Sequence, residues 1–341
     1  MKIAFITTLE LKSRASGVRR QAETWKSALE GAGCTVEYIN PWHHYDWKSF
    51  DALHVFGGGA WMPLFVKGAV EQGLPVVHSP MIDSAENKLL YRLVASVPHF
   101  GHRLYTIPAI HRFNNRLSTL CLARSRDEYD ILVQGLGVPP ERVRLVPICI
   151  DTSETAEISV ELPFDVGKPF CFHASQFTQP RKNVVRLAEA CGRLGLPLLV
   201  CGRPGSEEEA VEIEKQVLAH TKAHFLRFVE KGQLHWLFRN SRLFALPSLY
   251  EGVGLAALEA GYYGAEAVVS TVGGARDYFG TYAHYANPLD ISSIEGALRS
   301  ALERPLQPAL QEHVKANFTE AATCEMLLRT YQEAAQAAAR S

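Results

Sequence analysis

The sequence predicts an α/β protein of two domains, each built on a parallel sheet. A length of 341 residues fits two ordinary domains, and 47% hydrophobic with 21% charged residues is typical of chains that bury a core. The chain begins with a strand–helix–strand pattern, and residues 243–270 form a second pattern of strand, loop, helix and strand. Alternation of strands and helices in both halves indicates α/β domains.

The first domain opens with a strand at 2–7, a helix at 18–31 and a strand at 35–39. The loop before the helix carries Lys12 and Arg14, and Arg19 and Arg20 follow in the first helical turn. Cations at a helix N-terminus oppose the macrodipole, so they indicate a bound anion here, unless their side chains point to solvent.

The rest of the first domain is expected to alternate in the same way, with strands at 52–56, 74–78, 120–124 and 143–147 and a helix at 128–136. Gly57, Gly58 and Gly59 follow the 52–56 strand as a turn and do not form the G-x-G-x-x-G dinucleotide motif. The 74–78 strand ends on His78, at the carboxyl end where α/β proteins place ligands. A lone histidine can equally be structural.

Residues 87–126 contain no Asp or Glu. Their cations alternate with apolar and aromatic residues: Lys88, Arg92, Arg103, Arg112, Arg116, Arg124 and Arg126. Such a segment can lie on an anionic membrane surface or hold an anionic acceptor such as a lipid pyrophosphate. The alternative is a set of helices that bury the apolar residues and leave the arginines in solvent.

Residues 152–168, acidic and then with Pro and Gly, are the expected linker. The second domain should follow as strands at 170–174, 198–200, 243–246 and 267–270, with helices at 183–192, 292–302 and 310–336. Arg181 and Lys182 precede the 183–192 helix, where adjacent cations again indicate an anion. Exposed surface cations are the alternative.

A glycine-containing loop follows the 243–246 strand. Glu251 stands at the carboxyl end of this strand, and Glu259 lies eight residues later, inside the next helix. Gly252 and Gly254 let a ligand approach the backbone, and the free N–H groups of the helix start favour an anion. A diphosphate fits this loop, with the two carboxylates left to accept hydrogen bonds from sugar hydroxyls.

The run PSLYEGVGLAALEA at 247–260 resembles the Glu-x7-Glu element of retaining glycosyltransferases of family 4, which have the GT-B fold. FTQPRKN at 177–183 resembles the Pro-Arg-Lys segment of the same family. The resemblance implies two facing Rossmann-like domains with a central cleft. These would be an acceptor-side domain at 1–160, a nucleotide-sugar-binding domain at 161–320, and a helix at 321–341 that crosses back to the first domain.

The resemblance also assigns roles to residues. It implies catalytic roles for Glu251, Lys182 and His78, and donor binding by Arg181, Glu259, Gly252, Val253, Gly254, Leu255 and Gly17. Lys182 would contact the diphosphate, Glu251 the sugar hydroxyls and Glu259 the ribose. The chain departs from the family pattern at Ser16, Ile148 and Gln176, where the family has glycine, asparagine and arginine.

Several classes of function are disfavoured. A formal net charge of −1 argues against bulk nucleic-acid binding. The seven cysteines show no Cys-x-x-Cys spacing, and the histidines lack supporting ligands, so no metal site is expected. The absence of Asp-x-Asp predicts a reaction without a divalent metal or other cofactor. No stretch has the roughly 18 apolar residues of a membrane span, so we expect a cytoplasmic chain, peripheral at the inner face of the membrane.

We therefore expect a retaining hexosyltransferase that moves a sugar from a nucleoside-diphosphate sugar to a glycan or lipid-linked acceptor, in cell-surface polysaccharide or glycolipid synthesis. Two alternatives stay open at this point. The departures at Ser16, Ile148 and Gln176 would suit a catalytically silent nucleotide-sugar-binding partner, and the same fold could carry a nucleotide-sugar epimerase.

Overall fold

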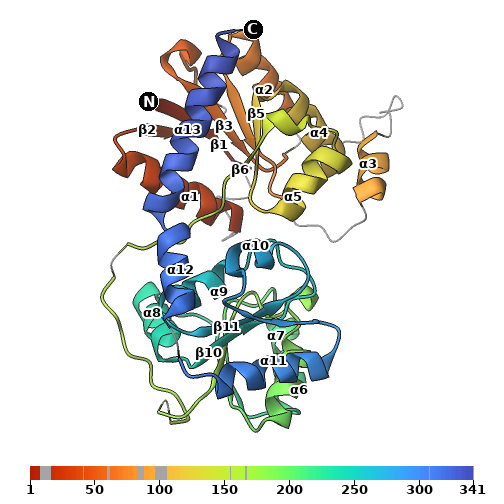
Figure 1. The fold of residues 1–341 in the computed structure, drawn as a ribbon, viewed down its shortest axis with the longest axis vertical. Helices are drawn as coiled ribbons and strands as arrows, with labels where there is room; N and C mark the ends of the chain where they lie inside the picture. The colour runs from red at the N-terminus through yellow and green to blue at the C-terminus, as the bar shows by residue number, and fades with distance from the viewer. Residues whose placement is uncertain are drawn as a thin grey trace. The chain divides into compact units, whose positions relative to one another are not determined.

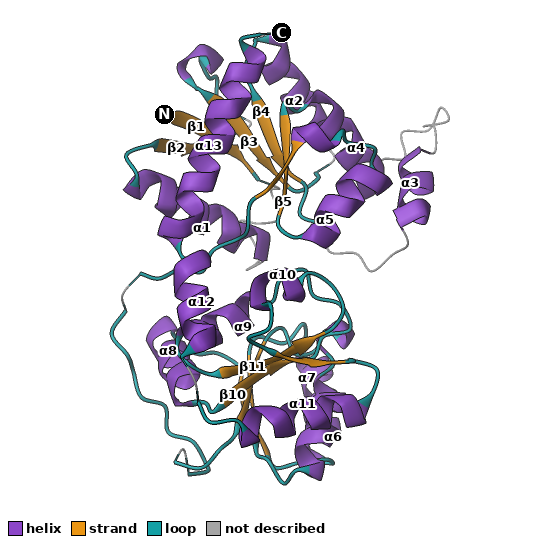
Figure 2. Cartoon of the chain, viewed as in Figure 1, coloured by secondary structure: helices purple, strands orange, loops and turns teal. Residues whose placement is uncertain are grey.

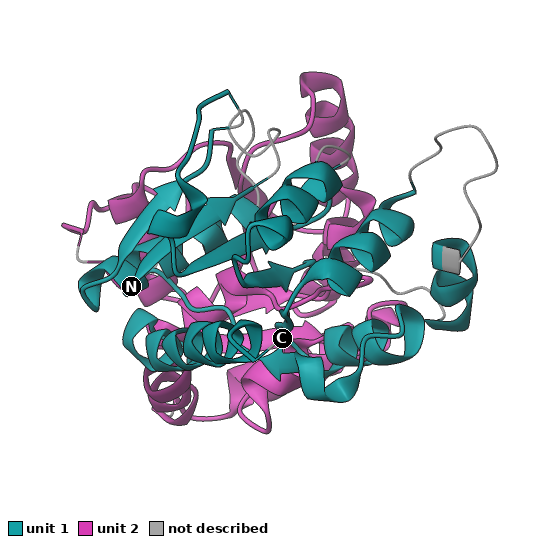
Figure 3. Cartoon of the chain, turned by 90° about the horizontal axis from the view of Figure 1, so that it is seen from above, with its two compact units in different colours: residues 1–151, 318–341 teal, residues 152–317 magenta. Residues whose placement is uncertain are grey.

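The computed structural model describes residues 1–7, 17–40, 42–59, 62–82, 88–96, 106–153, 155–165, 167–306 and 308–340. The chain divides into two units: unit 1 is Met1–Asp151 with Phe318–Ser341, and unit 2 is Thr152–Asn317 (Figure 3). Four residues that the sequence analysis singled out lie outside the described residues: Lys12, Arg14, Ser16 and Arg103.

The described part of unit 1 holds a six-stranded sheet in the order β2-β1-β3-β4-β5-β6, with every neighbouring pair parallel. Its strands are β1 (Lys2–Ile6), β2 (Thr35–Tyr38), β3 (Ala52–Phe56), β4 (Val76–Ser79), β5 (Leu120–Ala123) and β6 (Val143–Leu145). Every residue of β3, β4 and β5 is buried, as expected for central strands covered by helices on both faces.

Helices cover both faces of this sheet (Figure 2). They are α1 (Gly17–Gly31), α2 (Met62–Glu71), α3 (Lys88–Ser96), α4 (Ile107–Leu117), α5 (Arg126–Asp130) and α13 (Glu320–Ala338), with short helical turns η2 (Trp47–Ser49), η3 (Ile131–Gly135) and η4 (Pro140–Arg142). Because side chains alternate along a strand, Leu53 and Val55 pack on α2 whereas His54 faces α13.

The C-terminal helix α13 belongs to unit 1 and packs on α1 (Figure 1). Nδ1 of the buried His54 lies 2.6 Å from Oη of Tyr331, and the Cys324 thiol donates to the Ala28 carbonyl over 3.3 Å. These contacts join the last helix of the chain to its first strands and helix.

The described part of unit 2 holds a second six-stranded parallel sheet, in the order β12-β11-β10-β7-β8-β9. Its strands are β7 (Cys171–Ala174), β8 (Leu198–Cys201), β9 (Ala223–Leu226), β10 (Leu243–Leu246), β11 (Glu266–Ser270) and β12 (His284–Ala286). The two units thus share one architecture, and the α/β fold class predicted from the sequence is confirmed.

The unit 2 sheet is also covered on both faces. Its helices are α6 (Val184–Arg193), α7 (Glu207–Leu218), α8 (Lys231–Asn240), α9 (Leu255–Tyr262), α10 (Ala275–Phe279), α11 (Ile291–Glu303) and α12 (Ala309–Asn317), with the turn η5 (Pro180–Lys182). On one face Leu198, Val200 and Ala245 pack with α6 and α11. On the other, Phe172 and Phe244 contact Phe238 of α8.

Two helical predictions need correction. The single helix expected at 310–336 is two helices, because the Thr319 hydroxyl accepts a hydrogen bond from the Ala322 N–H and starts α13 afresh. The helix expected at 128–136 is α5 followed by the wider turn η3. The linker predicted at 152–168 contains no helix or strand in its described residues.

Candidate active site

The candidate site lies on unit 2, at the carboxyl ends of β7 and β10. From β7 the chain proceeds to β8 and β9 on one side of the sheet, then returns to β10, β11 and β12 on the other. The loops after β7 and β10 therefore diverge at the topological switch point, where open α/β sheets bind their ligands. The loop after β7 carries Arg181 and Lys182, and the loop after β10 carries Glu251.

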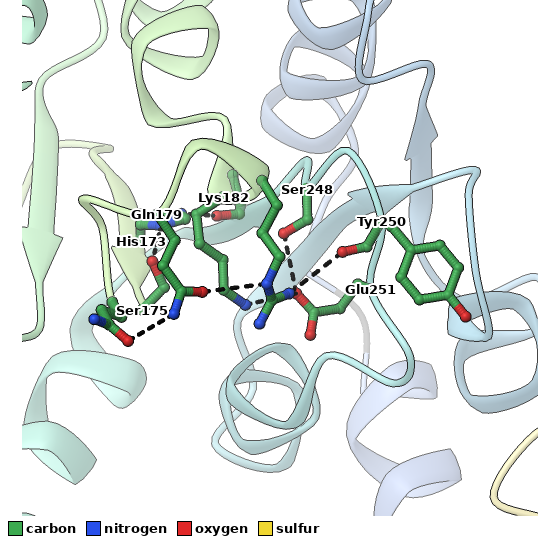
Figure 4. A network of polar contacts seen from close by, with 10 residues as sticks. His173, Ser175, Gln179, Lys182, Ser248, Tyr250 and Glu251 are labelled. Atoms are coloured by element: carbon green, nitrogen blue, oxygen red, sulfur yellow. Dashed lines mark hydrogen bonds and ion pairs between the residues drawn. The ribbon is translucent and has the colours of Figure 1, made fainter. Parts of the chain in front are cut away.

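The structure brings these three charged residues together. Figure 4 shows Lys182 beside Glu251, although the two lie 69 positions apart in the chain. Nζ of Lys182 lies 2.6 Å from Oε2 of Glu251, and Nη1 of Arg181 lies 3.3 Å from the same oxygen. The Ser248 hydroxyl donates to that oxygen as well, over 3.0 Å. All three donors thus converge on Oε2, and within the described part of the chain no hydrogen bond reaches Oε1.

Burial makes this cluster electrostatically strong. The side chains of Lys182 and Glu251 are only 10% and 14% exposed, whereas Arg181 is 43% exposed. Charges in such sheltered positions are screened by water far less than surface pairs. Two cations face one carboxylate, so the cluster has an excess positive charge. An anion is the ligand that balances it.

A buried, neutral histidine lies close to this cluster and links the two strands that carry its loops. His173 is the third residue of β7. Its Nδ1 donates to the Ala245 carbonyl over 2.8 Å, and Ser175 Oγ lies 2.7 Å from its Nε2. Burial lowers the pKa of His173 to about 4, with the carbonyl bond raising it and nearby Lys182 lowering it. The neutral ring therefore joins β7 to β10 near Lys182.

Asn183 was missed by sequence reasoning, and it holds the surrounding loops in place. Its backbone is left-handed, with φ of 61°, a conformation that asparagine tolerates better than most residues. Its side-chain amide donates to the Pro247 and Pro288 carbonyls, over 2.9 and 2.7 Å. The loops after β7, β10 and β12 are thus tied at one residue. An asparagine directly after the two cations was the available signal.

Gln176 stands where the family that the chain resembles has an arginine, and it contacts its neighbours through hydrogen bonds. Its side-chain oxygen accepts from the Gln179 amide over 2.7 Å, and the Gln179 oxygen accepts from Nε of Arg181 over 3.2 Å. Gln176 therefore contributes no charge, but it helps to orient the guanidinium of Arg181.

The loop that follows Glu251 leads into α9, whose N-terminus is open. Gly254 has φ of 87°, and its carbonyl accepts from the N–H groups of Ala257 and Leu258. No side chain caps the helix and its first turn has no acidic residue. Orphan N–H groups at a helix start favour an anion, as the sequence analysis expected for Gly252, Gly254 and Leu255. Val253 is 4% exposed, so its part in donor binding stays a prediction.

Glu251 is also fixed through its backbone. Its carbonyl accepts from the Gly274 N–H over 3.1 Å, and Glu251 pairs with Gly273 in a short parallel bridge. Gly273 has φ of 98°, and a Cβ there would lie 2.1 Å from the Glu251 carbonyl oxygen. Only glycine fits this position. The sequence analysis did not predict this contact.

The remaining predicted residues are placed as follows. Glu259 lies in α9 with 6% exposure, so its contact with ribose stays a prediction. Gly17, in unit 1, is the exposed first residue of α1.

His78 is fully buried in unit 1; Nε2 lies 2.9 Å from the Gly57 carbonyl and Nδ1 2.6 Å from the Asn115 side-chain oxygen. Burial lowers the pKa of His78. Because both nitrogens already have partners, its catalytic role also stays a prediction.

Two comparisons of sequence bear on this site. Residues 154–321 match the family Glycosyl transferases group 1. This segment spans unit 2 and therefore contains the whole cluster of Arg181, Lys182 and Glu251. The chain is also 29% identical over 132 residues to the O-antigen chain mannosyltransferase B of Escherichia coli. That match covers 37% of this chain and only 35% of the relative.

Solved structures match nearly the full chain. The HepE protein of Anabaena, in complex with UDP and glucose, has a TM-score of 0.70 and 14% identity, covering 98% of this chain and 100% of that one. Sucrose-phosphate synthase from Thermosynechococcus elongatus has a TM-score of 0.70 and 15% identity, covering 98% and 99%. These likenesses concern the fold, and they confirm the two-domain α/β GT-B class.

Among the described residues, no group of three or more His, Cys, Asp or Glu side chains is arranged to hold a metal ion. In the same part of the chain, no helix has the length and apolar character needed to cross a bilayer.

Proposed function

We propose that the chain is a retaining glycosyltransferase whose donor, a nucleoside-diphosphate sugar, binds at the switch point of unit 2. The observation that carries the proposal is the sheltered cluster in which Lys182 and Arg181 meet Glu251 with an excess positive charge. The open N-terminus of α9 adds N–H donors to the same loop. The group 1 family match over this unit supports a transferase, and HepE, of the same fold, was solved with UDP and glucose.

Lys182 stabilises the leaving group in this proposal. In the free protein its ammonium pairs with Glu251, and in the complex it turns to, or is shared with, the diphosphate. Negative charge accumulates on the diphosphate as the bond to the anomeric carbon breaks. The contacts from Lys182 and Arg181 therefore strengthen toward the transition state, which is the condition for catalysis. These cations take the place of a divalent metal.

Glu251 positions the sugar. The three donors Lys182, Arg181 and Ser248 all contact Oε2. Oε1 can therefore accept a hydrogen bond from a sugar hydroxyl while Oε2 still accepts one from Ser248. Glu259 would accept from the ribose. The acceptor hydroxyl oxygen then bonds to the anomeric carbon on the face that the diphosphate leaves, with retention. Its proton passes to the departing diphosphate, the base nearest on that face.

For the acceptor we propose a glycan or a lipid-linked sugar, in polysaccharide or glycolipid synthesis on the cytoplasmic side of the membrane. The Escherichia coli relative, named O-antigen chain mannosyltransferase B, supports this acceptor class.

Purified protein incubated with a panel of UDP-, GDP- and ADP-sugars tests the proposal. We expect release of free diphosphate from one donor class, accelerated by acceptor and lost in Lys182→Met. The variant of the exposed Lys215 on α7, Lys215→Met, is the matched control. Epimerised sugar without diphosphate release would identify an epimerase, and binding without either product a silent partner.

A further inference from the structure

An arginine lies over an aromatic ring at the carboxyl edge of the unit 2 sheet, outside the cluster of Arg181, Lys182 and Glu251. The Cζ atom of Arg203 is 5.2 Å from the centroid of the Phe228 ring. Arg203 follows β8 and Phe228 follows β9, so both lie at the edge where open α/β sheets bind their ligands. We call these two residues the stacked pair.

The Phe228 ring is open to solvent. It is 64% exposed, whereas Phe225 of β9 is half-buried and contacts the buried ring of Phe177. An aromatic face attracts a guanidinium placed over it, and this attraction orients the guanidinium while its N–H groups stay in solvent. The ring therefore supports Arg203 without burying it.

Arg203 keeps its N–H donors for a ligand. Within the part of the chain that the structure describes, no carboxylate or carbonyl accepts a hydrogen bond from its guanidinium. Arg227, which precedes Phe228, is instead neutralised by Glu214 over 2.8 Å and by Glu207. Of the two arginines beside this ring, Arg203 is thus the one with an uncompensated charge.

The loop that carries Arg203 is fixed to the loop of the cluster. The Gly205 N–H donates to the Thr178 hydroxyl over 2.8 Å. Gly202 has φ of 140°, and a Cβ there would lie 1.7 Å from the Ser175 carbonyl oxygen. Its N–H donates to the carbonyl of the last residue of β9 over 3.0 Å. The loops after β7, β8 and β9 therefore hold one another in place.

The stacked pair is placed to receive the base of a nucleotide whose diphosphate is held at the cluster. β8 and β9 are the first and second neighbours of β7, so the ends of β7 and β9 lie about 10 Å apart. Phe228 precedes α8, which packs on α9, so its loop lies on the face of the sheet where the open N-terminus of α9 begins. A ribose spans the gap between a base here and phosphates at that N-terminus.

The chemistry of a guanidinium selects among bases. It is a planar fork of donors with no acceptor. Guanine presents two adjacent acceptors, O6 and N7, on one edge, whereas adenine presents N7 beside the donor N6 and uracil presents O4 beside a carbon. Of these three bases, guanine alone can accept two parallel hydrogen bonds from Arg203.

We propose that Arg203 recognises the base of the donor and that the donor is a guanosine-diphosphate sugar. The guanidinium donates to O6 and N7, and Phe228 positions it in the plane of the base. This inference rests on the proposed function, and it adds to that site a specificity-determining residue and a substrate class.

Calorimetric titration with GDP, UDP and ADP tests the choice of base. We expect wild type to bind GDP about 5- to 150-fold more tightly than UDP or ADP, which is the discrimination of one bidentate pair. Arg203→Met should abolish this preference. Arg203→Lys should abolish it too, because lysine keeps the charge but lacks the fork. The control Arg299→Met changes an exposed arginine of α11 and should keep the preference.

An analogue tests the contact at the level of one atom. In 7-deaza-GDP a C–H group replaces N7, so wild type should bind it more weakly than GDP, whereas Arg203→Met should bind the two ligands alike.

The positioning role of Phe228 has its own variant. Phe228→Ala should weaken GDP binding about 2- to 5-fold, the value of an exposed cation–π contact, with an unchanged melting temperature. The control Leu218→Ala changes an apolar side chain of α7 that is 55% exposed and should bind GDP as wild type does.

The failures of the two proposals are distinguishable. Equal binding of GDP, UDP and ADP to wild type would overturn the inference about Arg203 and leave the donor site in place. A preference for GDP that Arg203→Met retains, or a loss of affinity for 7-deaza-GDP that is equal in wild type and Arg203→Met, would do the same. Binding of none of the three nucleotides would overturn the proposed function together with this inference.

Discussion

Replacing Lys182 and replacing Glu251 should change the affinity for a nucleoside diphosphate in opposite directions. Lys182→Met removes a cation that we assign to the diphosphate. Glu251→Gln removes the carboxylate whose Oε2 lies 2.6 Å from Nζ of Lys182 in the free protein. If the two residues only formed a structural pair, both substitutions would disturb the site alike. If Lys182 serves an anionic ligand, Glu251 competes with that ligand.

The magnitudes follow from burial. Breaking a fully buried pair costs about 3–5 kcal/mol and an exposed pair is worth about 0.2–1 kcal/mol. The side chains of Lys182 and Glu251 are 10% and 14% exposed, so the pair lies between these two limits. We therefore expect each single substitution to lower the free energy of unfolding by about 2 kcal/mol. Lys182→Met is the milder change, because Arg181 and Ser248 still contact Glu251.

For the nucleoside diphosphate, loss of a charge-assisted hydrogen bond of about 1.5–3 kcal/mol predicts roughly 10- to 150-fold weaker binding to Lys182→Met. Glu251→Gln should bind the same diphosphate at least as tightly as wild type, because a competing negative charge is gone. Its turnover should nevertheless fall, since the sugar hydroxyl loses a charged carboxylate acceptor and meets a weaker, neutral amide oxygen.

Calorimetric titration of wild type, both single variants and the double variant supplies the assay, alongside thermal unfolding without ligand. Coupling is expected in both measurements, since residues in direct contact are not additive. Equal losses of diphosphate affinity in Lys182→Met and Glu251→Gln would refute the competition argument. Strict additivity in the double variant would refute the coupling as well.

Three further outcomes are expected. Gly273→Ala should cost turnover and stability well beyond Gly195→Ala, because a Cβ at Gly273 meets the Glu251 carbonyl at 2.1 Å while Gly195, at a similar positive φ, has open space; matched melting temperatures would contradict this. Stability should fall as pH drops below about 6.5, because unfolding lets the buried His173 and His111, with pKa lowered to about 4 and 3, take up protons, worth up to about 2 kcal/mol each by pH 5. A flat profile of melting temperature from pH 7 to 5 would count against it. Sugar transfer should persist in EDTA, and loss of transfer that magnesium restores would show a metal requirement.

The sequence allowed the strands to be predicted closely, because buried parallel strands are short apolar runs with turns at both ends. β3 and β10 were predicted at their observed bounds. The break between α12 and α13 was missed, since an apolar helical pattern continues through Phe318 and only the Thr319 cap interrupts it.

The site was predicted as residues but not as a geometry. Lys182 and Glu251 were assigned separate contacts on a ligand, whereas the structure pairs them. Their meeting depends on the pairing of β7 with β10 and on Asn183, whose side chain spans the loops. Lys182 and Glu251 lie 69 positions apart in the chain, so the order of strands in the sheet decides whether they meet, and local sequence patterns do not encode that order.

Hydrogen–deuterium exchange with and without a nucleoside diphosphate tests the central claim most directly, because it reports where the ligand binds. Our account predicts protection in peptides that cover the loop after β7 with Lys182, the loop after β10 with the start of α9, and the Gly273–Gly274 turn. The same peptides should show little protection in Lys182→Met and full protection in Lys215→Met. Saturating diphosphate that protects peptides of unit 1 alone, or leaves these three loops unchanged, would contradict the assignment of the donor site to unit 2.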